Sequence, residues 1–348
     1  MGELISNILD INEKEENKNE EINRMSYKEE KIKIIESKSI LIDKDRFNYP
    51  QKNLLYYIDE IKLLICFYDY KIYCFSYPSF IRNIDYEEFI NTMDISYYNY
   101  QKNSNKLYVN YFGNEYANIF LIQKKSIKLL FEKIPLKIKD LIEISLQRII
   151  VLDYNNSCIC FEFKNNEYKK IKTFGENGGK IYTPKGLIVN DVFIYSIKIS
   201  PNRKKFFIIN CIGIQVFDSK TLELINILFI DNMDACFLDN NHFVTICNTT
   251  VNLFDLTTFK KLDTLNVFFK DGGRLQKLEN TPYFIAAQWK TVASVVILEL
   301  KNNKINYVRK INDFSIPYNS SINFNNTIFI DSGFEKIFIY KLDFNNKI

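Results

Sequence analysis

The chain repeats one pattern of apolar positions seven times. Each repeat begins with a run of mainly apolar residues, such as KLLICFYD at 62–69, and a second run follows within a few positions, such as KIYCFSY at 71–77. Short apolar runs and period-two alternation are both typical of β-strands. The first runs are 62–69, 106–113, 148–155, 205–212, 242–249, 283–290 and 327–334, and the second runs are 71–77, 117–123, 157–163, 213–219, 250–256, 294–300 and 336–342.

The spacing of these pairs predicts how they are arranged. Equivalent positions in successive second runs, from Phe75 to Tyr340, are separated by about 44 residues on average. That is the period of WD40-type propeller blades, each of which is a small sheet of antiparallel strands. One such sheet cannot bury both of its faces alone, so the repeats have to pack around a ring. We therefore predict an all-β, seven-bladed WD40-like β-propeller over residues 32–348.

The two ends of the chain are expected to meet in the last blade. The seventh repeat supplies SSINF, TIFIDSGF and KIFIYKL, which are only three strands. The segment IKIIESKSILI at 32–42 is the natural source of the missing outermost strand. Residues 1–31 form an acidic N-terminal extension. We expect this extension to be disordered or helical, because residues 10–31 are too polar to bury a face.

Two aspartates support the same interpretation of the fold. Asp218 and Asp255 follow Phe217 and Phe254 in VFD and LFD, where WD repeats often have Trp-Asp. In such repeats the aromatic residue packs between sheets and the aspartate organises a turn. We expect both aspartates to be structural.

Charge is distributed unevenly along the chain. The formal net charge is +4, and residues 1–36 contain ten acidic and six basic side chains, so residues 37–348 carry +8. An acidic leader therefore precedes a mildly basic body. A basic body can approach nucleic acid through the phosphates, although this charge is spread over a large domain.

The chemistry-bearing residues favour a binding protein over an enzyme. The seven cysteines include no CxxC pair, and the N-terminus has no secretory pattern, so we expect reduced thiols inside the cell. Cys158 and Cys160 share one strand face and are interpreted as core thiols, and His242, the only histidine, as a structural residue. No nucleophile elbow, metal-ligand spacing or Gly-rich phosphate loop is present. We predict no catalytic site, no cofactor, no metal and, because no apolar run approaches 18 residues, no membrane span.

Two long spacers interrupt the repeats. Residues 79–92 are expected to make a short helical excursion between the first two blades. Residues 164–186 are basic and contain glycine, and we interpret them as a loop insertion able to carry contacts. Its lysines, together with Gln215, are the candidates for a partner interface on one edge of blades three and four. The candidate lysines are Lys169, Lys170, Lys172 and Lys180.

Four segments of the chain resemble, in order and spacing, the WD40 subunit of tRNA (guanine-N7) methyltransferase. The segment 132–163 is similar to the blade before the central turn of that subunit, and 191–229 to the following blade with its S-P-D turn. HFVTICNTTVNLFDLTTFKKLDTL at 242–265 falls where the family has H-F-V-S-x-I and a Trp-Asp strand, and 274–314 is similar to a late blade. The resemblance covers about half of the chain. One departure is Gln215, which stands where the family has an arginine or lysine that holds the catalytic partner.

This resemblance implies a non-catalytic role. The propeller would bind and stabilise a separate S-adenosylmethionine-dependent methyltransferase as a heterodimer, with the cofactor in the partner and possible contact to tRNA, in the nucleus or also the cytoplasm. A rigid support of this kind raises a rate by holding the partner in its competent state. The competing interpretations are a WD40-like scaffold in another assembly, such as ribosome assembly or vesicle coating, and a propeller hydrolase.

Overall fold

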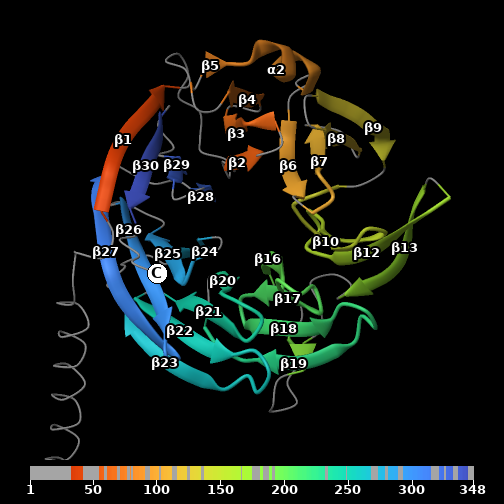
Figure 1. The fold of residues 1–348 in the computed structure, drawn as a ribbon. Helices are drawn as coiled ribbons and strands as arrows, with labels where there is room; N and C mark the ends of the chain where they lie inside the picture. Colours follow the sequence, from red (N-terminus) through yellow and green to blue (C-terminus); the bar gives the residue numbers. More distant parts are fainter. Residues whose placement is uncertain are drawn as a thin grey trace, which may run out of the picture.

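The protein forms a ring of small antiparallel sheets around a central axis (Figure 1). This computed structural model describes residues 33–41, 55–58, 61–68, 71–76, 79, 81–90, 95–101, 103–111, 116–123, 126–134, 137–165, 167–174, 181–182, 188–189, 193–231, 234–247, 249–267, 273–278, 281–288, 293–314, 321–324, 327–331 and 336–343. The predicted acidic extension, residues 1–31, lies outside the described residues.

Six sheets each contain four consecutive strands, and we number them as blades 1 to 6 in chain order. Blade 1 contains β2 (Leu55–Ile58), β3 (Leu63–Tyr68), β4 (Lys71–Ser76) and β5 (Ile81–Arg82); blade 2 contains β6 (Ile95–Gln101), β7 (Lys106–Tyr111), β8 (Ala117–Gln123) and β9 (Ser126–Ile134); blade 3 contains β10 (Asp140–Ser145), β11 (Arg148–Leu152), β12 (Cys158–Lys164) and β13 (Glu167–Phe174). Blade 4 contains β16 (Ile194–Ile199), β17 (Lys205–Asn210), β18 (Gly213–Asp218) and β19 (Leu224–Leu228); blade 5 contains β20 (Asp234–Phe237), β21 (His242–Cys247), β22 (Thr250–Asp255) and β23 (Lys261–Asn266); blade 6 contains β24 (Gly273–Lys277), β25 (Tyr283–Gln288), β26 (Ala293–Lys301) and β27 (Lys304–Phe314).

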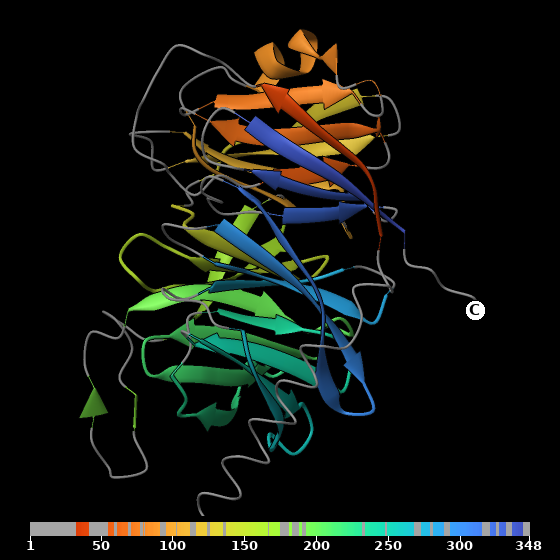
Figure 2. The ribbon, with the colours of Figure 1, turned by 90° about the vertical axis from the view of Figure 1, so that its left-hand side faces the viewer.

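A further four-stranded sheet, the closing sheet, takes its strands from both ends of the chain. It contains β28 (Ser321–Phe324), β29 (Thr327–Asp331), β30 (Lys336–Asp343) and β1 (Lys33–Leu41), and β1 pairs antiparallel with β30. β1 is the segment that the sequence analysis assigned to this position. Figure 1 shows the sheet running from β28 on the inside of the ring to β1 on the outside, and Figure 2 shows the red β1 beside the blue C-terminal strands.

The prediction of seven blades therefore needs a correction. The chain forms six blades from consecutive strands, and the remaining sheet is shared between its two ends. The physical reason is that three strands follow β27 in the described residues, so the last repeat takes its fourth strand from the other end of the chain.

Parts of the two long spacers also form helix or strand. α2 (Ile84–Ile90) confirms the helical excursion between blades 1 and 2. Asn83 caps its first turn by accepting the N–H of Tyr86 at 3.3 Å, and the buried Glu87 of α2 accepts the N–H of Cys74 at 2.9 Å, which fixes the helix to blade 1.

The described part of the second spacer is mainly strand and not loop, which corrects the sequence analysis. Residues Glu167–Phe174 form β13, the outermost strand of blade 3, and β14 (Ile181–Tyr182) pairs only with β15 (Ile188–Val189). An outer strand has one edge in solvent, so it does not need the apolar alternation by which inner strands are recognised.

The core lies between the blades and repeats from one interface to the next. Phe206 stacks on Phe217 at 5.0 Å between ring centroids in blade 4, and Phe243 stacks on Phe254 at 5.1 Å at the same places in blade 5. Cys158 and Cys160 are fully buried between blades 3 and 4, which confirms their interpretation as core thiols. Burying both faces of each sheet in this way is what holds the ring together.

Candidate partner-binding surfaces

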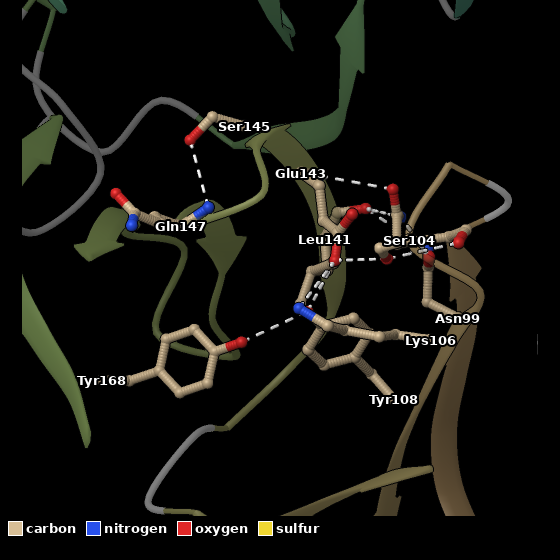
Figure 3. A network of polar contacts seen from close by, with 10 residues as sticks. Asn99, Ser104, Lys106, Tyr108, Leu141, Glu143, Ser145, Gln147 and Tyr168 are labelled. Carbon is tan, nitrogen blue, oxygen red and sulfur yellow. Dashed lines mark hydrogen bonds and ion pairs between the residues drawn. The ribbon is translucent and has the colours of Figure 1, made fainter. Parts of the chain in front are cut away.

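A buried polar network connects blades 2 and 3 (Figure 3). Its centre is Glu143 on β10, whose side chain is 1% exposed. The Glu143 Oε1 atom accepts hydrogen bonds from Ser104 Oγ at 2.7 Å and from the Tyr108 hydroxyl at 2.9 Å, and Lys106 Nζ lies 3.7 Å away. All three of these side chains belong to blade 2 or to its first turn. The carboxylate therefore fixes one blade to the next.

The network continues to the outside of blade 3. The Tyr108 hydroxyl is 3.4 Å from the hydroxyl of Tyr168, which lies on the outer strand β13. Burial raises the pKa of Tyr108 well above its usual value, and the nearby Glu143 and Tyr168 raise it further. The phenol therefore stays protonated and keeps donating to Glu143 at neutral pH.

This network is structural and not an active site. Glu143 Oε2 has no hydrogen-bond partner among the described residues, which is unusual for a buried carboxylate oxygen. However, Glu143 and Tyr108 are both shielded from solvent, so a substrate cannot reach them. Lys106 supplies the compensating charge, and groups of three or more metal-ligating side chains are absent from the described parts of the chain.

Two aspartates join the inner strands of neighbouring blades. Asp140, at the start of β10, accepts the N–H of Ile197 on β16 at 3.0 Å, and Asp234, at the start of β20, accepts the N–H of Leu275 on β24 at 3.0 Å. Lys198 of β16 lies near both carboxylates, and the charge of Asp234 raises its pKa most. Polar groups around the axis thus hold neighbouring blades in place. The sequence analysis missed these residues because a single acid before a strand is not a distinctive pattern.

The predicted interface lysines lie on a strand edge. Lys169 and Lys170 are exposed on β13, in agreement with their proposed accessibility. Lys172 Nζ donates to the backbone carbonyl of Leu222 in blade 4, so it is a contact between blades. Lys180 lies outside the described residues. Exposed lysines on an edge strand also oppose pairing with other chains, so their position alone does not require a partner.

Gln215 does not join these lysines in one cluster. It lies on β18, the third strand of blade 4, between Ile208 of β17 and Ile227 of β19, and is half-buried. A neutral side chain suits this position, since a charged one would lose much of its hydration between two isoleucines.

The exposed aromatic residues gather on one face of the ring. Consecutive strands alternate in direction, so the turn between the second and third strands and the connection to the next blade always lie on the same side. The aromatic side chains that the structure describes as exposed are all at such places. They are Tyr116 (45% exposed), Tyr154 (55%), Phe193 (52%) and Phe229 (37%), which we call the aromatic face.

The aromatic face is partly ordered by contacts between blades 3 and 4. Lys139 Nζ lies 4.2 Å from the centroid of the Phe193 ring and donates to the carbonyl of Ile194 at 3.2 Å. Asn156, next to the Tyr154 turn, accepts the N–H of Ile194 at 2.9 Å. The Tyr154 turn and Phe193 are therefore held in a fixed relation although both rings are half in solvent.

The opposite face carries lysines at equivalent turns. The turn between the third and fourth strands has an exposed lysine in four consecutive blades, 3 to 6. These residues, which we call the lysine arc, are Lys164, Lys220, Lys260 and Lys301.

The aspartates of this face are directed into their own turns. Asp218 Oδ1 accepts the N–H groups of Lys220 and Thr221, both at 2.8 Å, and Asp255 Oδ1 accepts those of Thr257 at 2.9 Å and Thr258 at 2.6 Å. These bonds lower the pKa of both carboxyl groups, with the Thr221 and Thr258 N–H groups as the largest causes. The structural role predicted for the two aspartates is confirmed.

His242 is a structural residue, as predicted. Its Nδ1 lies 3.0 Å from both carboxylate oxygens of Asp239, and its Nε2 lies 3.1 Å from Asn303 Oδ1 in blade 6. The imidazole thus connects blades 5 and 6.

None of the helices that the structure describes is long and apolar enough to cross a membrane.

Comparisons with known proteins identify the fold and nothing finer. No protein-family profile matches the chain, and no curated protein matches it. Among solved structures, one chain of the "Crystal Structure of Mitotic Checkpoint Complex" superimposes with a TM-score of 0.66 over 87% of this chain and 93% of that chain, at 8% sequence identity. Because 1315 solved chains match, the biological role of one such neighbour says nothing about function here. The chain therefore has the fold of a WD40-like β-propeller.

Proposed function

We propose that this protein is a non-catalytic propeller that binds a partner protein through its aromatic face. The observation that supports this most directly is the exposure of Tyr116, Tyr154, Phe193 and Phe229 on a single side of the ring. Tyrosine and other aromatic side chains are enriched at the centres of protein interfaces, where they bury a large area with little loss of side-chain freedom. A rigid ring that holds such side chains fits a scaffold better than an enzyme.

The experiment compares the two faces of the ring. The tagged full-length protein is used to capture the partner protein. One variant combines Tyr154→Ser with Phe193→Ser, and Leu146→Ser is the control variant. Leu146 is 70% exposed in the β10–β11 turn, on the opposite face, so the control removes an exposed apolar side chain and leaves the aromatic face intact. We expect the aromatic-face variant to lose the partner and the control to keep it. Equal retention by both variants would contradict the proposal.

In its more specific form, the proposed partner is the S-adenosylmethionine-dependent catalytic subunit of tRNA (guanine-N7) methyltransferase. The order and spacing of the segments 132–163, 191–229, 242–265 and 274–314 support it. The propeller would stabilise that subunit and support tRNA modification in the nucleus or also the cytoplasm. This form of the proposal adds to the aromatic face a second contact, at the edge of blades 3 and 4 with Lys169, Lys170 and Gln215.

Native co-purification distinguishes the specific form from its alternatives. A small methyltransferase together with tRNA would support it. A large multi-subunit assembly would favour a generic scaffold, and hydrolytic activity of the isolated chain would favour an enzyme.

A further inference from the structure

The two faces of the ring differ in chemistry. The aromatic face carries the exposed aromatic side chains, and the lysine arc lies on the other side. The turns that carry the arc are at the same place in each of four consecutive blades, so the four lysines follow one another around the rim. We propose that the lysine arc binds the phosphate backbone of RNA.

Neighbouring side chains strengthen the positive character of this surface. Lys204 is exposed in the first turn of blade 4, and Lys261 is exposed next to Lys260 in blade 5. The nearby Asp218 and Asp255 are half-buried and accept backbone N–H groups, so the outermost charges on these turns are the lysine ammonium groups. Carboxylates with exposed side chains do occur on this face in the described part, at Glu167, Glu223 and Asp239, but they are fewer than the lysines.

The arrangement favours a nucleic-acid backbone over other anions. Separate ammonium groups on four consecutive blades suit an extended polyanion, whereas a compact acidic motif requires a cluster of positive charges. The same turns carry no exposed aromatic side chain, among the residues described, on which bases could stack. Binding is therefore expected to depend on phosphates and on salt, and not on base sequence.

The test measures the affinity of the full-length protein for a fluorescein-labelled RNA duplex by fluorescence anisotropy, over a series of salt concentrations. One variant combines Lys220→Glu with Lys260→Glu, in adjacent blades of the arc. The control combines Lys128→Glu with Lys137→Glu, which are exposed on β9 and before β10 and change the net charge equally. A second pair, Lys164→Glu with Lys301→Glu, tests the two ends of the arc.

We expect each arc variant to weaken RNA binding at low salt by roughly tenfold or more. The slope of log affinity against log salt should become shallower, by the equivalent of about two phosphate contacts. The control should stay within about twofold of the unmodified protein, since screening limits distant charges. Absence of RNA binding by the unmodified protein at low salt would overturn the proposal, and so would equal losses in arc and control variants.

Two competitors decide the kind of anion. Polyglutamate and vesicles that contain anionic lipid are added to the preformed RNA complex. If either binds as tightly as RNA at equal charge concentration, the surface is not an RNA site and the inference is wrong. The inference does not depend on the aromatic face, because variants of that face leave the arc intact and are measured by protein capture.

Discussion

Asp140 and Asp234 occupy the same place two blades apart. Each stands at the start of an inner strand, and each carboxylate accepts a backbone N–H from the inner strand of the following blade at 3.0 Å. Each also accepts the N–H of the next residue in its own strand at 2.9 Å. One side chain thus fixes both the beginning of its strand and the position of the neighbouring blade.

Removing the Asp234 carboxylate should destabilise the ring. Asp234→Ala leaves the buried N–H of Leu275 without its acceptor, and an unpaired buried donor costs about 1–3 kcal/mol. The free energy of unfolding, measured by urea titration, should fall by that amount. Asp231→Ala, which changes an exposed acid in the same connection, is the control and should have little effect.

Glu143 should stabilise the fold through the hydrogen bonds and the ion pair that it forms with blade 2. Glu143→Ala removes the acceptor of Ser104 and Tyr108 and leaves Lys106 without the carboxylate beside it, so we expect a loss of roughly 3 kcal/mol. Tyr108→Phe removes one hydrogen bond and should cost about 1 kcal/mol. Thermal unfolding of both variants shows which substitution destabilises the protein more. A larger effect of Tyr108→Phe would contradict the central position of Glu143.

The cysteines should differ in reactivity. Burial raises the pKa of Cys160 to about 11 and raises that of Cys158 further, so both are protonated thiols at pH 8. Cys211 is exposed in the turn between β17 and β18. Iodoacetamide at pH 8 should therefore label Cys211 first, with Cys158 and Cys160 labelled only after denaturation. Peptide mass spectrometry follows each site, and early labelling of Cys158 would show that blades 3 and 4 separate readily.

Asp218 and Asp255 should contribute to acid sensitivity. The folded protein holds the pKa of both carboxyl groups below the usual value, so their stabilisation is present above the unfolded pKa of about 4 and is lost as the pH falls through the folded value. The double variant Asp218→Asn, Asp255→Asn should show a smaller loss of urea resistance than the unmodified protein as the pH falls from ~6 to ~3. An unchanged pH profile would exclude these turns as a source of acid sensitivity.

Lys169 and Lys170 test the predicted edge interface. Reversing both to Glu should leave the fold intact, because exposed charges contribute little to stability. Association with the methyltransferase should weaken, with an effect that shrinks as salt rises. Lys172 is left unchanged, since its ammonium group contacts the Leu222 carbonyl and its reversal would disturb blade 4. Unchanged capture at low salt would remove β13 from the interface.

The sequence predicted the inner and middle strands better than the outer ones. Strands such as β17 and β21 are buried on both sides, so their apolar runs reveal them. β13 was missed because EYKKIKTF is mostly exposed and therefore has no apolar pattern. The shared closing sheet could be anticipated from the short last repeat, since a missing strand requires a source elsewhere in the chain.

The candidate surfaces were less predictable than the fold. Glu143 had a usable signal, because a carboxylate inside the apolar strand DLIEIS needs a polar partner in the core. Tyr116 and Phe193 had none, since 23 tyrosines and 29 phenylalanines in one chain hide the few that remain exposed. Only the direction of the strands brings these rings to one side.

The shared closing sheet delays closure of the ring until the end of synthesis on the ribosome. β1 pairs with β30, and Leu41 lies opposite Lys336 in the register. At about 5–20 residues per second, the roughly 300 residues between them take about 15–60 s to synthesise. During that interval β1 has no partner strand, and blades 1 to 6 form an open arc with unpaired ends. A chaperone that shields the nascent β1 would thus protect the protein at its most aggregation-prone stage.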